Sequence, residues 1–158
     1  MKSCTRRLAL LGMLAASFLP VLLARGGAQA PFQTSAYKGK VIPLAGLLQK
    51  QGVKLDQDAA PSWMALVTDG GKIYPLVKDD GGRMFFKDAR LQGRPMRLTG
   101  RLVPGSELLQ VVNVHSYKGG KLHEVFYWCD ICSIRGYELH PCDCCGGPMD
   151  LREEPVKK

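Results

Sequence analysis

Apolar and polar residues alternate most regularly in the second half of the chain. The segment MRLTGRLV, residues 96–103, has an apolar residue or glycine at every even position, and Arg97, Thr99 and Arg101 at odd positions. A period of two predicts a strand that buries one face. Arg97, Thr99 and Arg101 are therefore expected on the outward face, where they either meet a phosphate or carboxylate group of a ligand or simply face solvent.

Four more short apolar stretches are bounded by turn residues. Asp69 is followed by two glycines between the first two stretches, and Lys118 is followed by two glycines between the last two. Such short connections are typical of hairpins. The pattern predicts five strands, over residues 63–69, 72–78, 96–103, 108–117 and 121–128.

Two short segments have helical rather than alternating spacing. Residues 44–48 are apolar at helical spacing and Gly52 follows them as a stop signal. Residues 83–91, RMFFKDARL, fit either a strand or a helix, and the spacing of Phe85, Phe86 and Ala89 favours the helix.

The order of these elements resembles an OB-fold. The element GRPMRLTGRLVPG followed by LLQVVNVHSY carries the resemblance, which covers roughly residues 63–128. It implies a mainly β protein built on a small five-stranded OB-like barrel with one or two short helices, and ligands of such barrels are often oligonucleotides or oligosaccharides. A fold alone does not establish that function.

The first thirty residues have the pattern of an export signal. Basic residues lie between positions 2 and 7, residues 8–24 carry no charge, and Ala28-Gln29-Ala30 follows. This order predicts a signal peptide cleaved after Ala30, and hence a periplasmic or secreted protein without a membrane span in its mature part. If it is not cleaved, the segment would serve as a membrane anchor. Export by the general or the twin-arginine route stays open.

The net charge is halved when residues 1–30 are set aside. The chain of 158 residues has a formal net charge of +8, but four basic residues and no acidic ones lie in residues 1–30. The remaining part has 18 basic and 14 acidic residues, a net charge of +4. That modest excess, together with export, argues against a nucleic-acid partner.

The strongest chemical signal is a pair of C-x-x-C motifs near the C-terminus. Cys129 and Cys132 form the first pair, and Cys142 and Cys145 form the second. Two such pairs at short separation can bring four thiolates to one tetrahedral metal ion. Cys145 is followed by a glycine, and this pair resembles the knuckles of rubredoxins and zinc ribbons, which implies a zinc-ribbon-like module over residues 129–153. The first pair is followed by Ser133, which weakens the match there.

Several alternatives stay open at this site. His140 and Cys144 are possible substitute ligands for the second pair. Tetrahedral sulfur ligands suit iron as well as zinc, and the absence of a companion cofactor motif favours zinc. Disulfide bonds are the competing interpretation for an exported protein, but paired C-x-x-C motifs are more typical of metal binding.

These signals divide the chain into five parts and rank three functions. We expect a signal peptide (1–30), an extension with a short helix (31–62), the barrel (63–128), the metal module (129–153) and a flexible tail (154–158). The leading hypothesis is an exported, non-catalytic binding module for an unidentified protein or oligomeric ligand, with a structural zinc ion. The alternatives are a periplasmic redox protein, using iron or a reactive C-x-x-C, and an oligonucleotide-binding protein. His115 and His123 flank a predicted turn; we expect them to be partly exposed strand residues, and a metal-binding or acid-base pair across the hairpin is the alternative.

Overall fold

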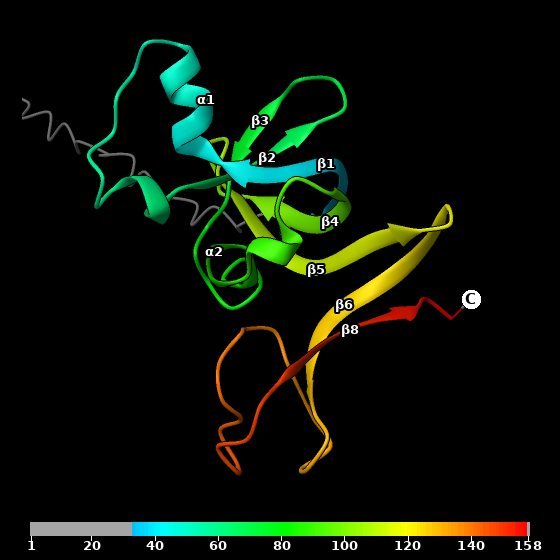
Figure 1. Cartoon of the computed structure of the whole chain (residues 1–158). Helices are drawn as coiled ribbons and strands as arrows, with labels where there is room; N and C mark the ends of the chain where they lie inside the picture. The colour runs from blue at the N-terminus through cyan, green and yellow to red at the C-terminus, as the bar shows by residue number, and fades with distance from the viewer. Residues whose placement is uncertain (1–32, 158) are drawn as a thin grey trace, which may run out of the picture. The chain divides into compact units, whose positions relative to one another are not determined.

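The computed structural model describes residues 33–157, which are mainly β (Figure 1). Eight strands form one antiparallel sheet in the order β3-β2-β1-β4-β5-β6-β7, and β8 pairs with the other edge of β6. The strands are β1 (Ser35–Pro43), β2 (Met64–Thr68), β3 (Ile73–Pro75), β4 (Pro95–Leu102), β5 (Leu109–Lys118), β6 (Lys121–Cys129), β7 (Ile134–Gly136) and β8 (Asp150–Pro155).

The sheet differs from the expected closed five-stranded barrel. It is an open path of eight strands, because β6 leaves the first five strands and pairs with β7 and β8. At the far end, a single parallel bridge joins Leu76, just after β3, to Leu109 of β5. The amide of Val77 donates to the Leu109 carbonyl at 3.0 Å. The contact between the two outer strands of the first five is therefore limited to one point.

Strand β1 lies in a segment for which the sequence predicted only a short helix. It pairs with β2 on one side and β4 on the other. Its inward positions include Gly39 and Val41, and a Cβ atom at Gly39 would lie 2.1 Å from the Val67 carbonyl oxygen. Glycine is thus required where β1 and β2 approach closely, and it also removes an apolar side chain from the alternating pattern.

The helical segments are short, as expected. The described helices are α1 (Leu44–Lys50), α2 (Met84–Lys87) and the 3-10 turns η1 (Ala60–Ser62) and η2 (Ala89–Leu91). The prediction over residues 44–48 is confirmed by α1, which is followed by Gly52 at a φ of +81°. The favoured helix in residues 83–91 is present as α2 and η2. None of the described helices is long and apolar enough to span a membrane.

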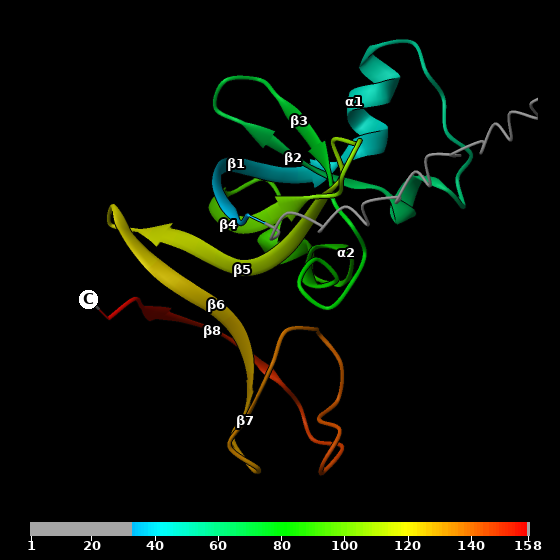
Figure 2. The ribbon, with the colours of Figure 1, turned by 180° about the vertical axis from the view of Figure 1, so that it is seen from behind.

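Strand β6 connects the first part of the sheet to the C-terminal cysteines, as both views show (Figures 1 and 2). Val125, Tyr127 and Cys129 on one face of β6 are almost fully buried. They belong to the same apolar cluster as residues of β1, β2 and β4, and this cluster also includes Cys142 and Met149. The cysteine segment therefore packs on the core of the sheet and is continuous with it.

The C-terminal residues and the hairpin histidines lie in defined strand positions. Glu154 and Pro155, which the sequence placed in a tail, are the last residues of β8. His115 lies opposite Glu124, whereas His123 lies opposite Ser116. Since successive residues of a strand point to opposite faces, the two histidines lie on different faces of the hairpin and do not pair. Both are partly exposed strand residues, as expected.

Candidate metal centre

The first cysteine pair begins where β6 ends. Cys129 is the last residue of β6 and has no exposed surface. Its sulfur accepts hydrogen bonds from the amides of Ile131 and Cys132, two and three residues further on. Ser133, directly after the pair, has a φ of +53° and is the one non-glycine residue with a positive φ in residues 33–157. These features define a tight turn that directs both thiols to one side.

The second pair repeats this local geometry. The amides of Cys145 and Cys144 donate to the sulfur of Cys142 and lower the pKa of that thiol to about 7. The Gly147 amide donates to the Cys145 sulfur at 3.4 Å. Gly146 has a φ of +69°, and its amide donates to the Cys142 carbonyl at 2.7 Å. Amides that point at sulfur stabilise the thiolate form, the form that binds metal.

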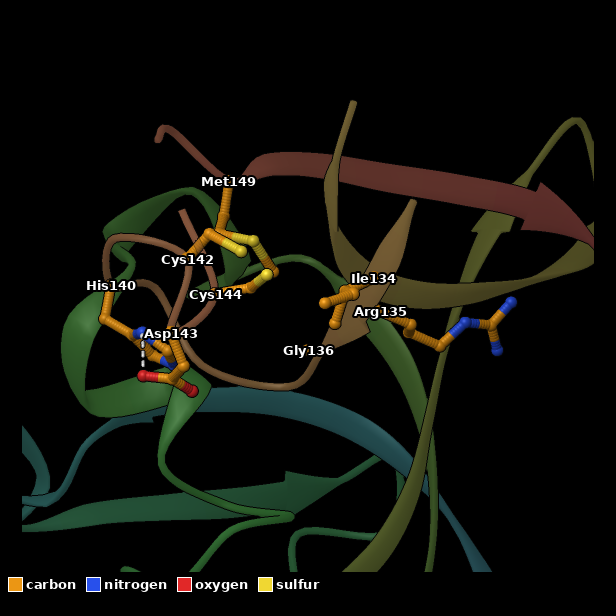
Figure 3. Close-up of a pocket in the computed structure, with 8 residues that line it drawn as sticks. All are labelled: Ile134, Arg135, Gly136, His140, Cys142, Asp143, Cys144 and Met149. Atoms are coloured by element: carbon orange, nitrogen blue, oxygen red, sulfur yellow. Dashed lines mark ion pairs between the residues drawn. The ribbon is translucent and has the colours of Figure 1, made fainter. Parts of the chain in front are cut away.

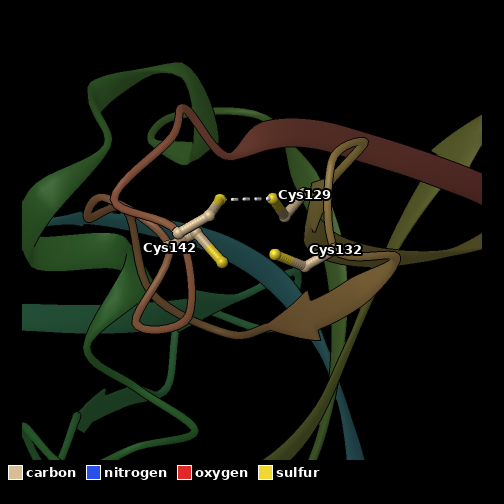
Figure 4. A group of neighbouring side chains, drawn as sticks. Cys129, Cys132 and Cys142 are labelled. Carbon is tan, nitrogen blue, oxygen red and sulfur yellow. Dashed lines mark hydrogen bonds between the residues drawn. The ribbon is translucent and has the colours of Figure 1, made fainter.

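The two turns bring four thiols to one point (Figure 4). The sulfur atoms of Cys129, Cys132, Cys142 and Cys145 all lie within 4.8 Å of one another. The Cys129 and Cys145 sulfurs are 3.6 Å apart. A tetrahedral ion bound about 2.3 Å from four sulfurs would separate those sulfurs by about 3.8 Å. The four side chains therefore have a spacing that can hold a metal ion.

The cysteines of this segment are all free thiols. The five described cysteines form no disulfide among themselves. Cys129 and Cys142 are buried, Cys132 is half-buried, and Cys145 is exposed. The thiols of Cys129 and Cys142 belong to the apolar core. Cys132 is packed against that core, and Cys145 lies toward solvent. The cluster therefore lies at the edge of the apolar core.

The two substitute ligands occupy different places. His140 is outside the four-thiol group, and its Nδ1 lies 3.7 Å from a carboxylate oxygen of Asp143. Cys144 is exposed and lies outside the four-thiol group. A pocket of about 290 Å³ beside the cluster is lined by both residues and by Cys142 (Figure 3).

Charged groups attach the cysteine segment to the rest of the protein. Glu138, between the two pairs, accepts a hydrogen bond of 2.7 Å from Arg83 and also pairs with Lys87 of α2. Arg152 of β8 pairs with Asp130 inside the first turn. Both turns are therefore tied to neighbouring elements by ion pairs as well as by apolar packing.

A buried carboxylate fixes the strand that carries the first pair. Asp88, 3% exposed, accepts a hydrogen bond of 2.8 Å from the Tyr127 hydroxyl and a bond of 2.7 Å from Arg90. Burial opposes its ionisation, but these bonds outweigh burial and lower the pKa of Asp88. Tyr127 lies two residues before Cys129 and is fully buried. The bond thus anchors β6 beside the metal site.

The expected ligand-facing residues share the outward face of β4. Arg97, Thr99 and Arg101 are all partly exposed, between buried Met96 and Leu98 and the bulge at Gly100. Arg97 lies between Lys38 of β1 and His115 of β5 in the sheet register. This face is more than 26 residues away in sequence from the cysteines, and none of the three side chains belongs to the four-thiol cluster.

Arg101 is already engaged with its own protein. Its Nε donates to the Gln110 side chain at 2.6 Å, and Gln110 donates to Asp79 at 2.6 Å. On the same face, His115 has a buried Nδ1 without a hydrogen-bond partner in residues 33–157. Burial and the positive charge of Arg97 lower the pKa of His115, which favours the neutral ring.

Sequence reasoning missed the left-handed conformation of Ser133. The serine takes the backbone role that glycine has after the second pair, so the first turn has the same form without its glycine. The spacing C-x-x-C was the signal that located this turn. No residue preference identifies a serine in this conformation in advance, because non-glycine residues seldom adopt it.

Comparisons with known proteins found no match: no protein-family model, no curated protein and no solved structure matches this chain.

Proposed function

We propose that this protein is an exported, non-catalytic binding module in which Cys129, Cys132, Cys142 and Cys145 hold a structural zinc ion. The observation that carries the proposal is the repeated geometry of the two cysteine turns, which places four thiols within 4.8 Å of one another. An ion bound by four protein ligands has no open position for water or substrate. The role that follows for the metal is to stabilise the fold.

The size of the cysteine segment supports a structural role for the ion. Residues 129–149 contain the last residue of β6 and the short strand β7, and otherwise consist of turns and irregular segments. Few of their side chains join the core, among them Cys129, Cys142 and Met149. A structural zinc ion contributes an apparent binding energy of about 10–16 kcal/mol in small peptides. The ion would replace the apolar burial that this segment lacks.

Zinc is proposed over iron for chemical reasons. Both ions accept four thiolates in a tetrahedron. An iron site would transfer electrons to a partner or to a second cofactor, and the sequence has no haem, flavin or nucleotide motif to supply one. An iron-containing preparation would therefore favour the alternative, a periplasmic electron carrier.

The binding role is proposed for an OB-like arrangement of β1 to β5. In support, β1 pairs with both β2 and β4, a helix lies between β3 and β4, and one parallel bridge connects residues at the end of β3 and the start of β5. The outward residues Arg97 and Thr99 are the proposed contacts for an acidic group of an oligomeric or protein ligand. Arg101 would position this face through Gln110.

Elemental analysis of the purified protein tests the metal assignment. We expect about one zinc ion per chain in the wild type and in the control variant Cys144→Ser, and loss of zinc in Cys129→Ser. If the protein contains iron and absorbs visible light, the structural zinc role is wrong and the electron-transfer alternative is favoured. A protein without metal whose cysteines are oxidised would contradict the proposal.

A separate titration tests the binding face. An acidic oligosaccharide and a neutral one of equal length serve as probes for wild type and the double variant Arg97→Ala/Thr99→Ala. The proposal requires weaker binding of the acidic probe by the variant at unchanged zinc content. Equal affinities for wild type and variant would remove these residues from the ligand contact.

A further inference from the structure

A surface pocket of about 460 Å³ lies at one end of the outward face of β4 and β5. Its walls come from the end of β4, the start of β5, the loop over residues 79–81 and Tyr137 of the cysteine segment. The volume is within the range of about 300–1,000 Å³ that small-molecule sites have. Among the residues that the structure describes, no cysteine lines it. The pocket is therefore separate from the metal centre.

Two backbone features shape this pocket. A Cβ atom at Gly81 would lie 1.9 Å from the Val111 carbonyl oxygen, so the glycine lets the loop lie directly against β5. The register of β4 and β5 shifts between Thr99 and Gly100, which makes Val112 the extra residue of a bulge on β5. Such a bulge redirects a side chain, and Val112 is exposed at the pocket wall. The pocket thus results from a close loop contact and a strand irregularity.

A chain of hydrogen bonds holds the polar side chains of the pocket. Arg101 Nε donates to the side-chain oxygen of Gln110 at 2.6 Å, and Gln110 Nε2 donates to Asp79 Oδ2 at 2.6 Å. Asp79 Oδ1 accepts the Gly82 amide at 3.3 Å. In these bonds the side-chain oxygen and nitrogen of Gln110 each use one of their two bonding positions. A guanidinium, an amide and a carboxylate are therefore fixed side by side.

The composition of the walls favours one class of ligand. A sugar hydroxyl both donates and accepts hydrogen bonds, so it matches a wall that combines donors and acceptors. Tyr137 and Val112 add exposed apolar surface, and the C–H face of a sugar ring packs on an aromatic face. Asp79 and Asp80 repel the phosphates of a nucleic acid, and Arg101 repels the basic groups of a cationic peptide. A hydroxyl-rich ring meets neither obstacle.

We propose that this pocket binds one sugar unit of an oligosaccharide whose acidic group lies at Arg97 and Thr99. The inference rests on the proposed binding face, because Arg101 belongs to the same outward row of β4 as those two residues. Tyr137 stacks on the sugar ring, and Gln110 binds its hydroxyl groups. Since Tyr137 lies between the two cysteine pairs, the metal-binding segment supplies the aromatic wall of the pocket. The ligand class is thus an acidic glycan.

Calorimetric titration of the purified protein tests the ligand class. The probes are tetrasaccharides made of neutral hexose, N-acetylhexosamine or uronic acid units. A single-stranded oligonucleotide and a glutamate-rich peptide are the comparison ligands. We expect the uronic acid tetramers to bind most tightly and the neutral tetramers to bind more weakly. Absence of binding by every tetrasaccharide, or binding of the oligonucleotide or peptide in their place, would overturn the inference.

Substitutions locate the binding within the pocket. Tyr137→Ala should weaken the binding of acidic and neutral tetramers alike by about tenfold at unchanged metal content, whereas Tyr137→Phe keeps the ring and should retain wild-type affinity. Gln110→Leu should also weaken both. The matched control is Trp63→Ala, because Trp63 is 46% exposed against 44% for Tyr137 and lies outside the pocket. Wild-type affinity of Tyr137→Ala would overturn the inference.

The failure of this inference differs from a failure of the proposed binding face. If Arg97→Ala/Thr99→Ala binds the acidic tetramer as tightly as wild type and Tyr137→Ala does not, the contact at Arg97 and Thr99 is wrong and the pocket stands. If only the double variant is weakened, the pocket is wrong and the binding face stands.

Discussion

Ser133 and Gly146 occupy equivalent positions in the two cysteine turns and share a left-handed backbone conformation. Each follows the second cysteine of its C-x-x-C pair, with φ values of +53° and +69°. An amide of each turn donates to the sulfur of its first cysteine. The two turns are therefore local repeats of one geometry, although only one has the glycine that this conformation favours.

This equivalence predicts the response of Ser133 to substitution. Ser133→Gly should change the free energy of unfolding by no more than about 0.5 kcal/mol, because relief of strain is offset by greater freedom of the unfolded chain. Ser133→Val should destabilise by about 1–2 kcal/mol, because a β-branched residue rarely adopts a positive φ. Denaturant unfolding of the zinc-loaded variants measures both. Equal stability of the valine and glycine variants would show that the conformation at Ser133 is not strained.

Glu153 predicts a pH dependence of stability. This carboxylate of β8 is 8% exposed; Arg94 donates to it at 2.6 Å, and Ser116 donates to it as well. Burial opposes ionisation, but these bonds lower the pKa of Glu153 to about 2 from the usual 4.5. A lowered pKa adds stability above pH 4.5 that is lost as the pH falls toward 2.

Substitution isolates this contribution. Glu153→Gln should cost about 2–3 kcal/mol of unfolding free energy at pH 7. The cost should shrink between pH 5 and pH 2. Glu154→Gln, an exposed neighbour on β8, is the control, since acid also displaces metal from both proteins. A cost for Glu153→Gln that does not change with pH would contradict the proposed network.

The bond between Tyr127 and Asp88 predicts a coupling between β6 and the metal site. Tyr127→Phe removes the 2.8 Å bond and leaves Asp88 with Arg90, which should destabilise the protein by about 1–2 kcal/mol. Tyr117→Phe on β5 is the control. Thermal unfolding with and without a zinc chelator measures the effect, and a cost equal to that of the control would rule out the anchoring role.

The elements with clear alternation could be predicted from the sequence. Arg97, Thr99 and Arg101 alternate with apolar residues and lie in β4 as expected. β1 was missed because an inward position holds Gly39 instead of an apolar side chain. A side chain there would clash with the Val67 carbonyl oxygen. Strands β7 and β8 were not predicted. β7 has only three residues, and β8 carries charged residues such as Glu153, whose partner Arg94 is distant in sequence.

The metal site was predictable from spacing, but its shape was not. Two C-x-x-C pairs identified the cysteines that the structure brings within 4.8 Å. Cys145 belongs to the four-thiol group, and Cys144 lies outside it. The hydrogen bond between the Cys129 and Cys145 thiols joins residues from the two different turns. Such tertiary contacts leave no local pattern in the sequence.

X-ray absorption spectroscopy at the zinc edge tests the four-thiolate site most directly. The account predicts a single shell of four sulfur atoms at about 2.3 Å from the ion. Nitrogen or oxygen atoms in that shell, or fewer than four sulfurs, would contradict it.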